Sequence, residues 1–304
     1  MRMGVDIGGT KTEAVAVADD GSVARSVRLR TGFGPHAVLE STVAAVTALA
    51  EATGLPVREF TTVGVGIPGA VDAATGRVSH ALNLGLERLA LGDELAARLG
   101  TGVRVENDVN AAALGAFHLF EQPAEASMSY LNLGTGLAAG LVLRGELWRG
   151  ARGGAGEIGH ILVDPAGPVD LDGQRGGLEV VASGSGIARQ WGRGDDNAVS
   201  AVLDAADSGD AEAVDIRRRL YEGVAASVRI LVLTVDVDLV VVGGGISGLG
   251  DRVMAGVRDV LAAWSAQSPF ILSLGLADRV RVLPPGVPVA AVGAAYLGAV
   301  PWPR

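Results

Sequence analysis

The sequence has 304 residues, of which 49% are hydrophobic, with 45 glycines and no cysteine. A chain of this length predicts two domains, and its apolar content excludes a disordered protein. The formal net charge of −9 argues against a nucleic-acid partner, because binding to a phosphate backbone needs a clustered basic surface.

The lack of cysteine excludes disulfides and thiolate metal sites. The N-terminus carries no apolar signal core. The longest apolar stretch, residues 230–242, is interrupted by Asp236 and Asp238 and is too short to cross a bilayer. We therefore expect a cytoplasmic protein. The basic run at 217–219 joins a helical pattern, and we interpret it as a solvated helix face.

The first 118 residues alternate strands and helices that are separated by glycine turns. Residues 3–18 predict a strand, a Gly-Gly-Thr turn and a second strand, and residues 19–21 predict a hairpin turn. The further elements expected are strands at 23–30, 62–67 and 103–105 and helices at 37–53, 91–99 and 107–118.

The second half repeats this plan. A strand at 129–133, a Gly-Thr-Gly turn and a strand at 138–143 repeat the unit of residues 3–18. An internal duplication with a phosphate-binding type of turn in each copy suggests two similar lobes around a nucleotide. The remaining elements expected are helices at 185–192, 198–206, 210–234, 250–267 and 288–297 and a buried strand at 238–242.

Three glycine-rich turns are candidate nucleotide sites. In the segment Asp6-Ile7-Gly8-Gly9-Thr10-Lys11, the glycines let backbone amides approach phosphate oxygens, and the carboxylate could hold hydrated magnesium. Residues 132–136 form the corresponding turn of the second copy, and residues 243–245 could receive adenine and ribose. The alternative is that each turn is only a tight connection between elements.

The segment Glu106-Asn107-Asp108-Val109-Asn110 lies where a strand ends and an alanine-rich helix begins. On a purely structural interpretation, Asn107 or Asp108 caps the helix. Three amide or carboxylate side chains around one carboxylate exceed what a cap requires. A carboxylate at this place can accept the proton of a hydroxyl that attacks phosphorus, so Asp108 is a candidate general base.

Residues 153–160, with the sequence GGAGEIGH, place a carboxylate and an imidazole on one glycine-rich loop. A lone His is usually a structural residue, and a lone Glu is usually solvated. Their position on one loop favours a site for a polyhydroxylated ligand.

Together these motifs resemble the ROK family (repressors, open reading frames and sugar kinases) of the actin-like ATPase superfamily. The resemblance extends over nearly the whole chain. It is carried by DIGGTK at 6–11, GIPGAVD at 66–72, ENDVNAA at 106–112, LGTGLAAGLVLRGEL at 133–147, GGAGEIGH at 153–160, GLEVVASG at 177–184 and VVGGG at 241–245.

The resemblance implies an α/β protein with the two-lobed actin-like ATPase (ribonuclease H-like) fold, with duplicated strand–Gly turn–strand units and an interlobe cleft that closes over sugar and nucleotide. We expect residues 1–115 to form the N-terminal lobe, completed by the C-terminal helix at 290–304. Residues 116–289 would form the C-terminal lobe.

The resemblance also implies roles for individual residues. Asp108 would be the general base, and Asp6 would hold magnesium through water. The sugar would be bound by Gly69, Asn83, Asn107, Asp108, Glu157, His160 and Glu179. The nucleotide would be bound by Asp6, Gly8, Gly9, Thr10, Lys11, Gly134, Thr135, Gly136, Gly244 and Gly245.

The sequence departs from the family at one place. Many members carry a Cys-x-Cys-Gly-x-x-Gly-Cys zinc motif before the Leu-Glu pair, whereas residues 170–177 read DLDGQRGG. All three thiolates are missing, so we predict no structural zinc. Whether Asp170, Asp172 and His160 bind any metal stays open. The departure puts the substrate preference in question more than the chemistry.

The implied activity is ATP-dependent phosphoryl transfer to the 6-hydroxyl of a hexose, with glucose as the leading candidate and with ATP and Mg²⁺ required. The alternative is a kinase of a modified sugar, such as kanosamine, N-acetylmannosamine, N-acetylglucosamine or a glucose-like cyclitol. A sugar-responsive regulator is disfavoured. Regulators of this family carry a helix-turn-helix segment ahead of the first motif, whereas in this sequence that motif already begins at Asp6. Whether ATP or polyphosphate is the phosphoryl donor stays open. No membrane partner is expected. A homodimer is expected only from the family resemblance.

Overall fold

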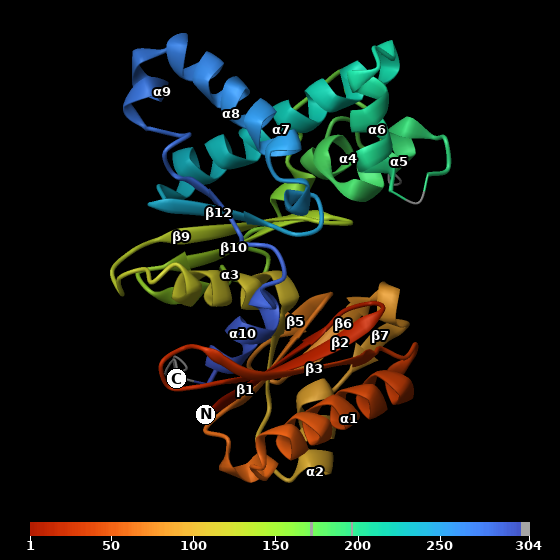
Figure 1. Cartoon of the computed structure of the whole chain (residues 1–304), viewed down its shortest axis with the longest axis vertical. Coiled ribbons are helices and arrows are strands. Elements are labelled where there is room, and N and C mark those ends of the chain that lie inside the picture. The colour runs from red at the N-terminus through yellow and green to blue at the C-terminus, as the bar shows by residue number, and fades with distance from the viewer. Residues whose placement is uncertain (171–172, 196, 299–304) are drawn as a thin grey trace. The chain divides into compact units, whose positions relative to one another are not determined.

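The computed structural model describes residues 1–170, 173–195 and 197–298 (Figure 1). It is a mixed α/β protein, as the sequence predicts. The chain divides into two compact units. The first unit consists of residues 1–125, residues 140–155 and the chain from residue 286 onward, and the second consists of residues 126–139 and 156–285. The lobe boundaries and the cleft expected from the sequence stay predictions, and part of the expected C-terminal helix, 299–304, lies outside the described residues.

The first unit is built on a five-stranded sheet of order β3-β2-β1-β4-β8. The strands are β1 (Arg2–Ile7), β2 (Lys11–Val17), β3 (Val23–Arg30), β4 (Val63–Ile67) and β8 (Arg104–Asn107). Strands β1, β4 and β8 run parallel, whereas β2 and β3 join the sheet as antiparallel strands. The carboxyl ends of the three parallel strands therefore meet at one edge, where Asp6 and Asn107 lie.

Helices cover both faces of this sheet (Figure 1). Helix α1 (Pro35–Thr53) packs on β1, β2 and β3, and α10 (Val289–Tyr296) packs on β1, β2, β4 and α3 (Asp108–Leu119). Helix α1 starts with Pro35 in its first turn and ends at Gly54, which has a φ of 71°. Proline suits a helix start, and glycine takes the left-handed conformation of a helix end without strain.

Helix α10 approaches the sheet and α3 closely because glycines lie at both contacts, Gly4 on β1 and Gly293 on α10 itself. A Cβ added to Gly4 would overlap the carbonyl oxygen of Ala291. A Cβ added to Gly293 would overlap the carbonyl oxygen of Ala111. Backbone packs against backbone at these places, which only a residue without a Cβ allows. This packing fixes α3, and thereby Asp108 at its first position, relative to the sheet.

A three-stranded antiparallel sheet in the first unit was not expected from the sequence. It consists of β5 (Ala70–Asp72), β6 (Arg77–Ala81) and β7 (Leu86–Leu89). Most residues of these short strands are exposed or half-buried, so they lack the apolar alternation that marks a strand in a sequence. The same unit contains α2 (Leu91–Leu99), at the expected place, and β11 (Glu146–Trp148).

A second five-stranded sheet has the order β11-β10-β9-β12-β13, and the division between the two units falls within β10. Its other strands are β9 (Met128–Leu133), β10 (Leu137–Leu143), β12 (Leu239–Gly243) and β13 (Val280–Val282). Strands β9, β12 and β13 are parallel.

Helices of the second unit lie on one side of β9 and β12 in Figure 1, drawn from green to blue. They are α4 (Leu178–Ala182), α5 (Gly184–Trp191), α6 (Ala198–Asp207), α7 (Ala211–Val235), α8 (Asp251–Ala266) and α9 (Pro269–Ser273). Helices α5 to α8 correspond to those expected from the sequence. Within the described ranges, no helix combines the length and the apolar character that a bilayer-crossing segment needs.

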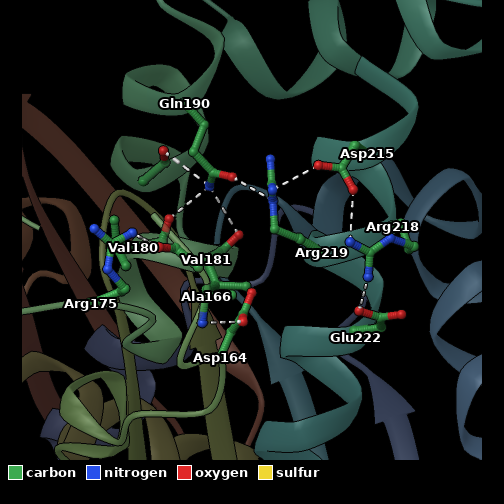
Figure 2. Close-up of polar contacts among 12 residues, drawn as sticks. Asp164, Ala166, Arg175, Val180, Val181, Gln190, Asp215, Arg218, Arg219 and Glu222 are labelled. Carbon is green, nitrogen blue, oxygen red and sulfur yellow. Dashed lines mark hydrogen bonds and ion pairs between the residues drawn. The ribbon is translucent and has the colours of Figure 1, made fainter. Parts of the chain in front are cut away.

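Polar contacts tie α4, α5 and α7 together (Figure 2). Gln190 on α5 donates from Nε2 to the carbonyl oxygens of Val180, at 2.7 Å, and Val181, at 3.3 Å. Its Oε1 accepts from Arg219 Nε at 3.1 Å. Arg218 is half exposed, as expected for a solvated helix face, whereas the side chain of Arg219 is only 23% exposed. The interpretation of the basic run as a solvated face is therefore wrong for Arg219, which bonds a neighbouring helix.

Candidate functional site

The first unit brings two candidate carboxylates close together. Asp6 pairs in register with Gly66 of β4, and a Cβ at Gly66 would lie 3.6 Å from the Cα of Asp108. Burial and the charges of Asp108 and Glu13 raise the pKa of Asp6 to about 7, although the Lys11 ammonium opposes the shift. The raised pKa of Asp6 therefore reflects its burial first and the neighbouring carboxylates second.

Asn107 is the N-cap of α3. Its Oδ1 accepts the backbone amides of Val109, at 2.9 Å, and Asn110, at 3.2 Å. Its Nδ2 donates to the Gly69 carbonyl oxygen at 3.2 Å, which joins the start of α3 to the loop after β4. Asp108 occupies the first helical position, is half-buried and accepts the Val109 amide at 3.0 Å. Because Asn107 already caps the helix, Asp108 is not needed for that purpose.

Glu106 holds this segment in place, a role that the sequence did not assign to it. Its side chain is 2% exposed. Oε1 accepts from the Asn107 amide at 3.0 Å and from Asn110 Nδ2 at 3.1 Å, and Oε2 accepts from Arg149 Nε at 2.6 Å. A buried carboxylate requires such partners. Glu106 belongs to a motif, but Arg149 is 43 residues away and only the tertiary structure reveals it as the partner.

The first glycine turn joins β1 to β2. Its geometry is fixed by the Gly8 amide, which donates to the Lys11 carbonyl oxygen at 2.9 Å. Gly9, Thr10 and Lys11 are exposed. The Asn83 amide nitrogen lies 3.5 Å from the place that a Cβ of Gly9 would take. The predicted phosphate ligands and one predicted sugar ligand therefore lie side by side.

Glu13 is a second residue that sequence reasoning missed. It pairs in register with Asp6 across β1 and β2, and it is 7% exposed. Arg28 Nη2 lies 2.8 Å from its carboxylate, and Lys11 Nζ lies 3.9 Å from it. Glu13 therefore competes with any bound phosphate for the charge of Lys11.

The second glycine turn, between β9 and β10, is held by α5. The carbonyl oxygen of Gly134 accepts from the Gly184 amide at 2.9 Å, and that of Thr135 accepts from the Ser185 amide at 3.0 Å. The Gly134 amide donates to the Gly136 carbonyl oxygen at 3.0 Å. These three backbone hydrogen bonds hold the turn in place and leave its glycines free of bulky side chains.

Glu179 links α4 to this turn. Its Oε2 accepts the Leu137 amide at 3.0 Å, and a Cβ at Gly136 would lie 2.8 Å from the same oxygen. Glu179 and His160 are both exposed and line one cavity of about 120 Å³. Glu157, the third predicted sugar ligand of this unit, precedes the 3₁₀ turn Ile158–His160. The structure thus brings His160 and Glu179 to one cavity, whereas Glu157 lies just before the turn that contains His160.

A larger cavity of about 530 Å³ contains the remaining glycines. Gly244 has a φ of +88°, and its Cβ would lie 2.5 Å from the Leu133 carbonyl oxygen, so the backbone itself requires glycine there. Around Gly245 no atom lies within 4 Å of a Cβ position, which leaves an open main-chain surface. The lining residues are Asn132, Gly134, Thr135, Gly184, Ser185, Ala188, Asp195, Asn197, Ala198, Val199, Gly244, Gly245, Ile246 and Leu249. Asp195 and Asn197 belong to no motif and were missed.

The surroundings of Asp6 fit a magnesium ion. Carboxylate oxygens are ligands that this ion prefers, and a cation would offset both the burial and the charges of Asp108 and Glu13 that raise the pKa of Asp6. In the parts of the chain that the structure describes, no three Asp, Glu or His side chains are grouped to hold a metal. A magnesium ion held through water and phosphate needs no such group. Asp172 lies outside the described residues, so the question of a metal at Asp170, Asp172 and His160 stays open, and the absence of structural zinc stays a prediction.

The chain belongs to the ROK family, whose model matches residues 2–297. It is 32% identical over 276 residues to a glucokinase of Thermotoga maritima, with 84% of this chain and 86% of the relative covered. An N-acetyl-D-glucosamine kinase of Pasteurella multocida is 32% identical over 261 residues, with 81% of this chain and 84% of the relative covered.

Among solved structures, a ROK family glucokinase from Streptomyces griseus in complex with glucose and AMPPNP superposes with a TM-score of 0.75. It is 30% identical to this chain, and the match covers 97% of this chain and 98% of that one. The family and the α/β fold class expected from the motifs are therefore confirmed.

Proposed function

We propose that this protein transfers the γ-phosphoryl group of ATP to the 6-hydroxyl of glucose. The observation that carries the proposal is the placement of Asp108. It lies at the first position of α3, near Asp6, while Asn107 takes over the capping of the helix. The glucokinases among the relatives, one of them solved with glucose and AMPPNP, support this choice of substrates.

In this proposal each chemical group of the first unit has one task. Asp108 accepts the proton of the attacking sugar hydroxyl, and Asn107 and Glu106 keep its backbone in position. The amides of the turn at residues 8–9 and the Lys11 ammonium face the phosphates. Asp6 would hold magnesium through water, and the bound ion would supply positive charge that balances the phosphates. Positioning and electrostatics provide most of the rate enhancement.

In the second unit, the cavity at Gly244 and Gly245 accommodates the adenosine, and the turn at 134–136 contributes main-chain contacts to the nucleotide. Glu157, His160 and Glu179 bind sugar hydroxyls. The bond from the Leu137 amide to Glu179 orients this carboxylate for a second bond. The protein is proposed to act as a cytoplasmic homodimer.

A kinase of a modified sugar is the second candidate. Two observations favour it: the loop at 170–177 lacks the thiolates of the family motif, and one relative is an N-acetyl-D-glucosamine kinase. A few hydrogen bonds in the pocket are sufficient to change such a preference.

A coupled assay of ATP consumption with a panel of sugars tests the proposal. The panel contains glucose, mannose, N-acetylglucosamine, N-acetylmannosamine and 3-amino-3-deoxyglucose, with ATP and polyphosphate as alternative donors. We expect kcat/KM for glucose with ATP to exceed that of every other pair by at least about tenfold. A higher value for an amino or N-acetyl sugar would establish the second candidate, and no sugar-dependent turnover would refute both.

A further inference from the structure

A cavity of about 910 Å³ in the first unit is lined by four arginines, and three of them, Arg77, Arg88 and Arg152, have no part in the proposed reaction. It is bordered by β5, β6 and β7 and by the loop after β11. Arg77 lies on β6, Arg88 lies on β7, and Arg149 and Arg152 belong to the loop. Small residues make up much of the remaining lining, among them Ala70, Ala73, Ala74, Ala90 and Ala151.

The positive charges of this cavity exceed its negative charges. Arg149 is bound to Glu106, but Arg77, Arg88 and Arg152 form no ion pair with any residue that the structure describes. Asp72 is the one carboxylate among the lining residues.

Asp72 does not neutralise the three arginines. Its pKa is lowered by the Thr75 hydroxyl and by the backbone amides that donate to it, and the more distant charge of Arg77 adds to this effect. Asp72 therefore stays ionised, but its hydrogen bonds are made within its own turn. One carboxylate that is already bonded leaves a net positive charge at the cavity.

Arginines that line one cavity and form no ion pair with a described residue are chemically suited to phosphoryl oxygens, which guanidinium groups bind in a bidentate way. Arg77, Arg88 and Arg152 come from three separate segments, and the cavity is much larger than a single phosphate ion. No aromatic ring is found among the residues that line it, so a nucleoside base would have no stacking surface there. We propose that this cavity binds an anion that carries several phosphoryl groups, an oligophosphate.

Isothermal titration of the full chain with sodium tripolyphosphate tests this inference. Glucose and a non-hydrolysable ATP analogue are added at saturation, with magnesium in excess, so that the proposed substrate sites are blocked. Inorganic phosphate and glucose 6-phosphate are titrated in parallel. We expect saturable binding of tripolyphosphate, at least about tenfold tighter than binding of either single-phosphate anion.

The double variant Arg88→Gln/Arg152→Gln removes two of these guanidinium groups and leaves Arg149 bound to Glu106. The matched control, Arg25→Gln/Arg58→Gln, removes the same charge from positions outside the cavity. We expect tripolyphosphate binding to weaken at least about tenfold in the first variant only, with both variants folded by circular dichroism. This comparison does not depend on kinase activity.

The inference is overturned if tripolyphosphate does not bind saturably or if both double variants bind it equally well. Tighter binding of inorganic phosphate or glucose 6-phosphate than of tripolyphosphate would also overturn it, because the spread of the arginines would then have no role.

Discussion

The candidate residues of the two units are of different chemical kinds. In the first unit, ionisable side chains gather at the carboxyl edge of the sheet, where burial and the charges of Asp108 and Glu13 raise the pKa of Asp6. In the second unit, the cavity at Gly244 and Gly245 is formed largely by main chain and small side chains. Both regions begin from the same strand–turn–strand unit, so the difference arises from what packs around it.

This difference shows two ways of preparing a site. Gathering like charges lowers the stability of the empty protein, and a ligand cation can recover that free energy. A surface of backbone carries no such electrostatic penalty, but it tolerates no Cβ where the chain passes close to another segment. Substitutions in the first unit should therefore change activity and the pH dependence of stability, whereas those in the second should act through steric overlap.

The largest effect is expected for Asp108→Ala. Loss of the general base should lower kcat by about 10³-fold, or about 4 kcal/mol of transition-state stabilisation, in a steady-state assay. Asp251→Ala is the matched control, because Asp251 also occupies the first position of a helix but is 86% exposed and pairs with Arg258. Near-normal turnover of Asp108→Ala would refute the assigned role.

Asp6→Asn should change the pH dependence of stability. The pKa of Asp6 rises from 3.8 to about 7 on folding, so the native protein loses stability as pH rises from about 4 to 7, and the Asn variant does not. Above pH 7 the variant should be more stable by a few kcal/mol, at most about 4, in denaturant titrations without magnesium. Added magnesium should reduce the gap. A stability difference that stays constant between pH 4 and 8 would show that ionisation of Asp6 is not the cause.

Gly244→Ala and Gly245→Ala form a pair that separates folding from binding in the second unit. The first change forces alanine to a φ of +88° and places its Cβ 2.5 Å from a carbonyl oxygen, so we expect a loss of roughly 2 kcal/mol or more in the free energy of unfolding. Gly245→Ala meets no neighbour and should alter stability by less than about 0.5 kcal/mol. It should raise KM for ATP several-fold. Equal stability of both variants would show that the overlap is relieved.

The smallest effect is expected for Glu179→Ala, which removes the acceptor of the Leu137 amide. We expect a decrease of about 1 kcal/mol in the free energy of unfolding, measured by urea titration, together with a higher KM for the sugar. Glu222→Ala, which removes a half-exposed ion pair with Arg218, should change stability by less than about 0.5 kcal/mol and leave KM unchanged. If Glu179→Ala leaves KM for the sugar unchanged, its role as a sugar ligand is wrong.

Much of the fold could be predicted because the hydrophobic periodicity of each element agreed with the glycine and capping residues at its ends. Gly100 caps the end of α2, and Asn107 caps the start of α3, at the places that the sequence indicated. The sheet of β5, β6 and β7 was missed because its strands are short and largely exposed. Arg219 was misjudged because its partner, Gln190, comes from another helix.

What the sequence determined by itself was the order of the long helices and of the strands of the two larger sheets' interiors, the glycine turns and the motif with Asp108. These features depend on residues that are close in the chain, where backbone conformation and capping act. Only the tertiary structure decided that Arg149 neutralises Glu106 and that Arg77, Arg88 and Arg152 line one cavity. Such pairings are set by which segments the packing of sheets and helices brings together, and no local pattern encodes them.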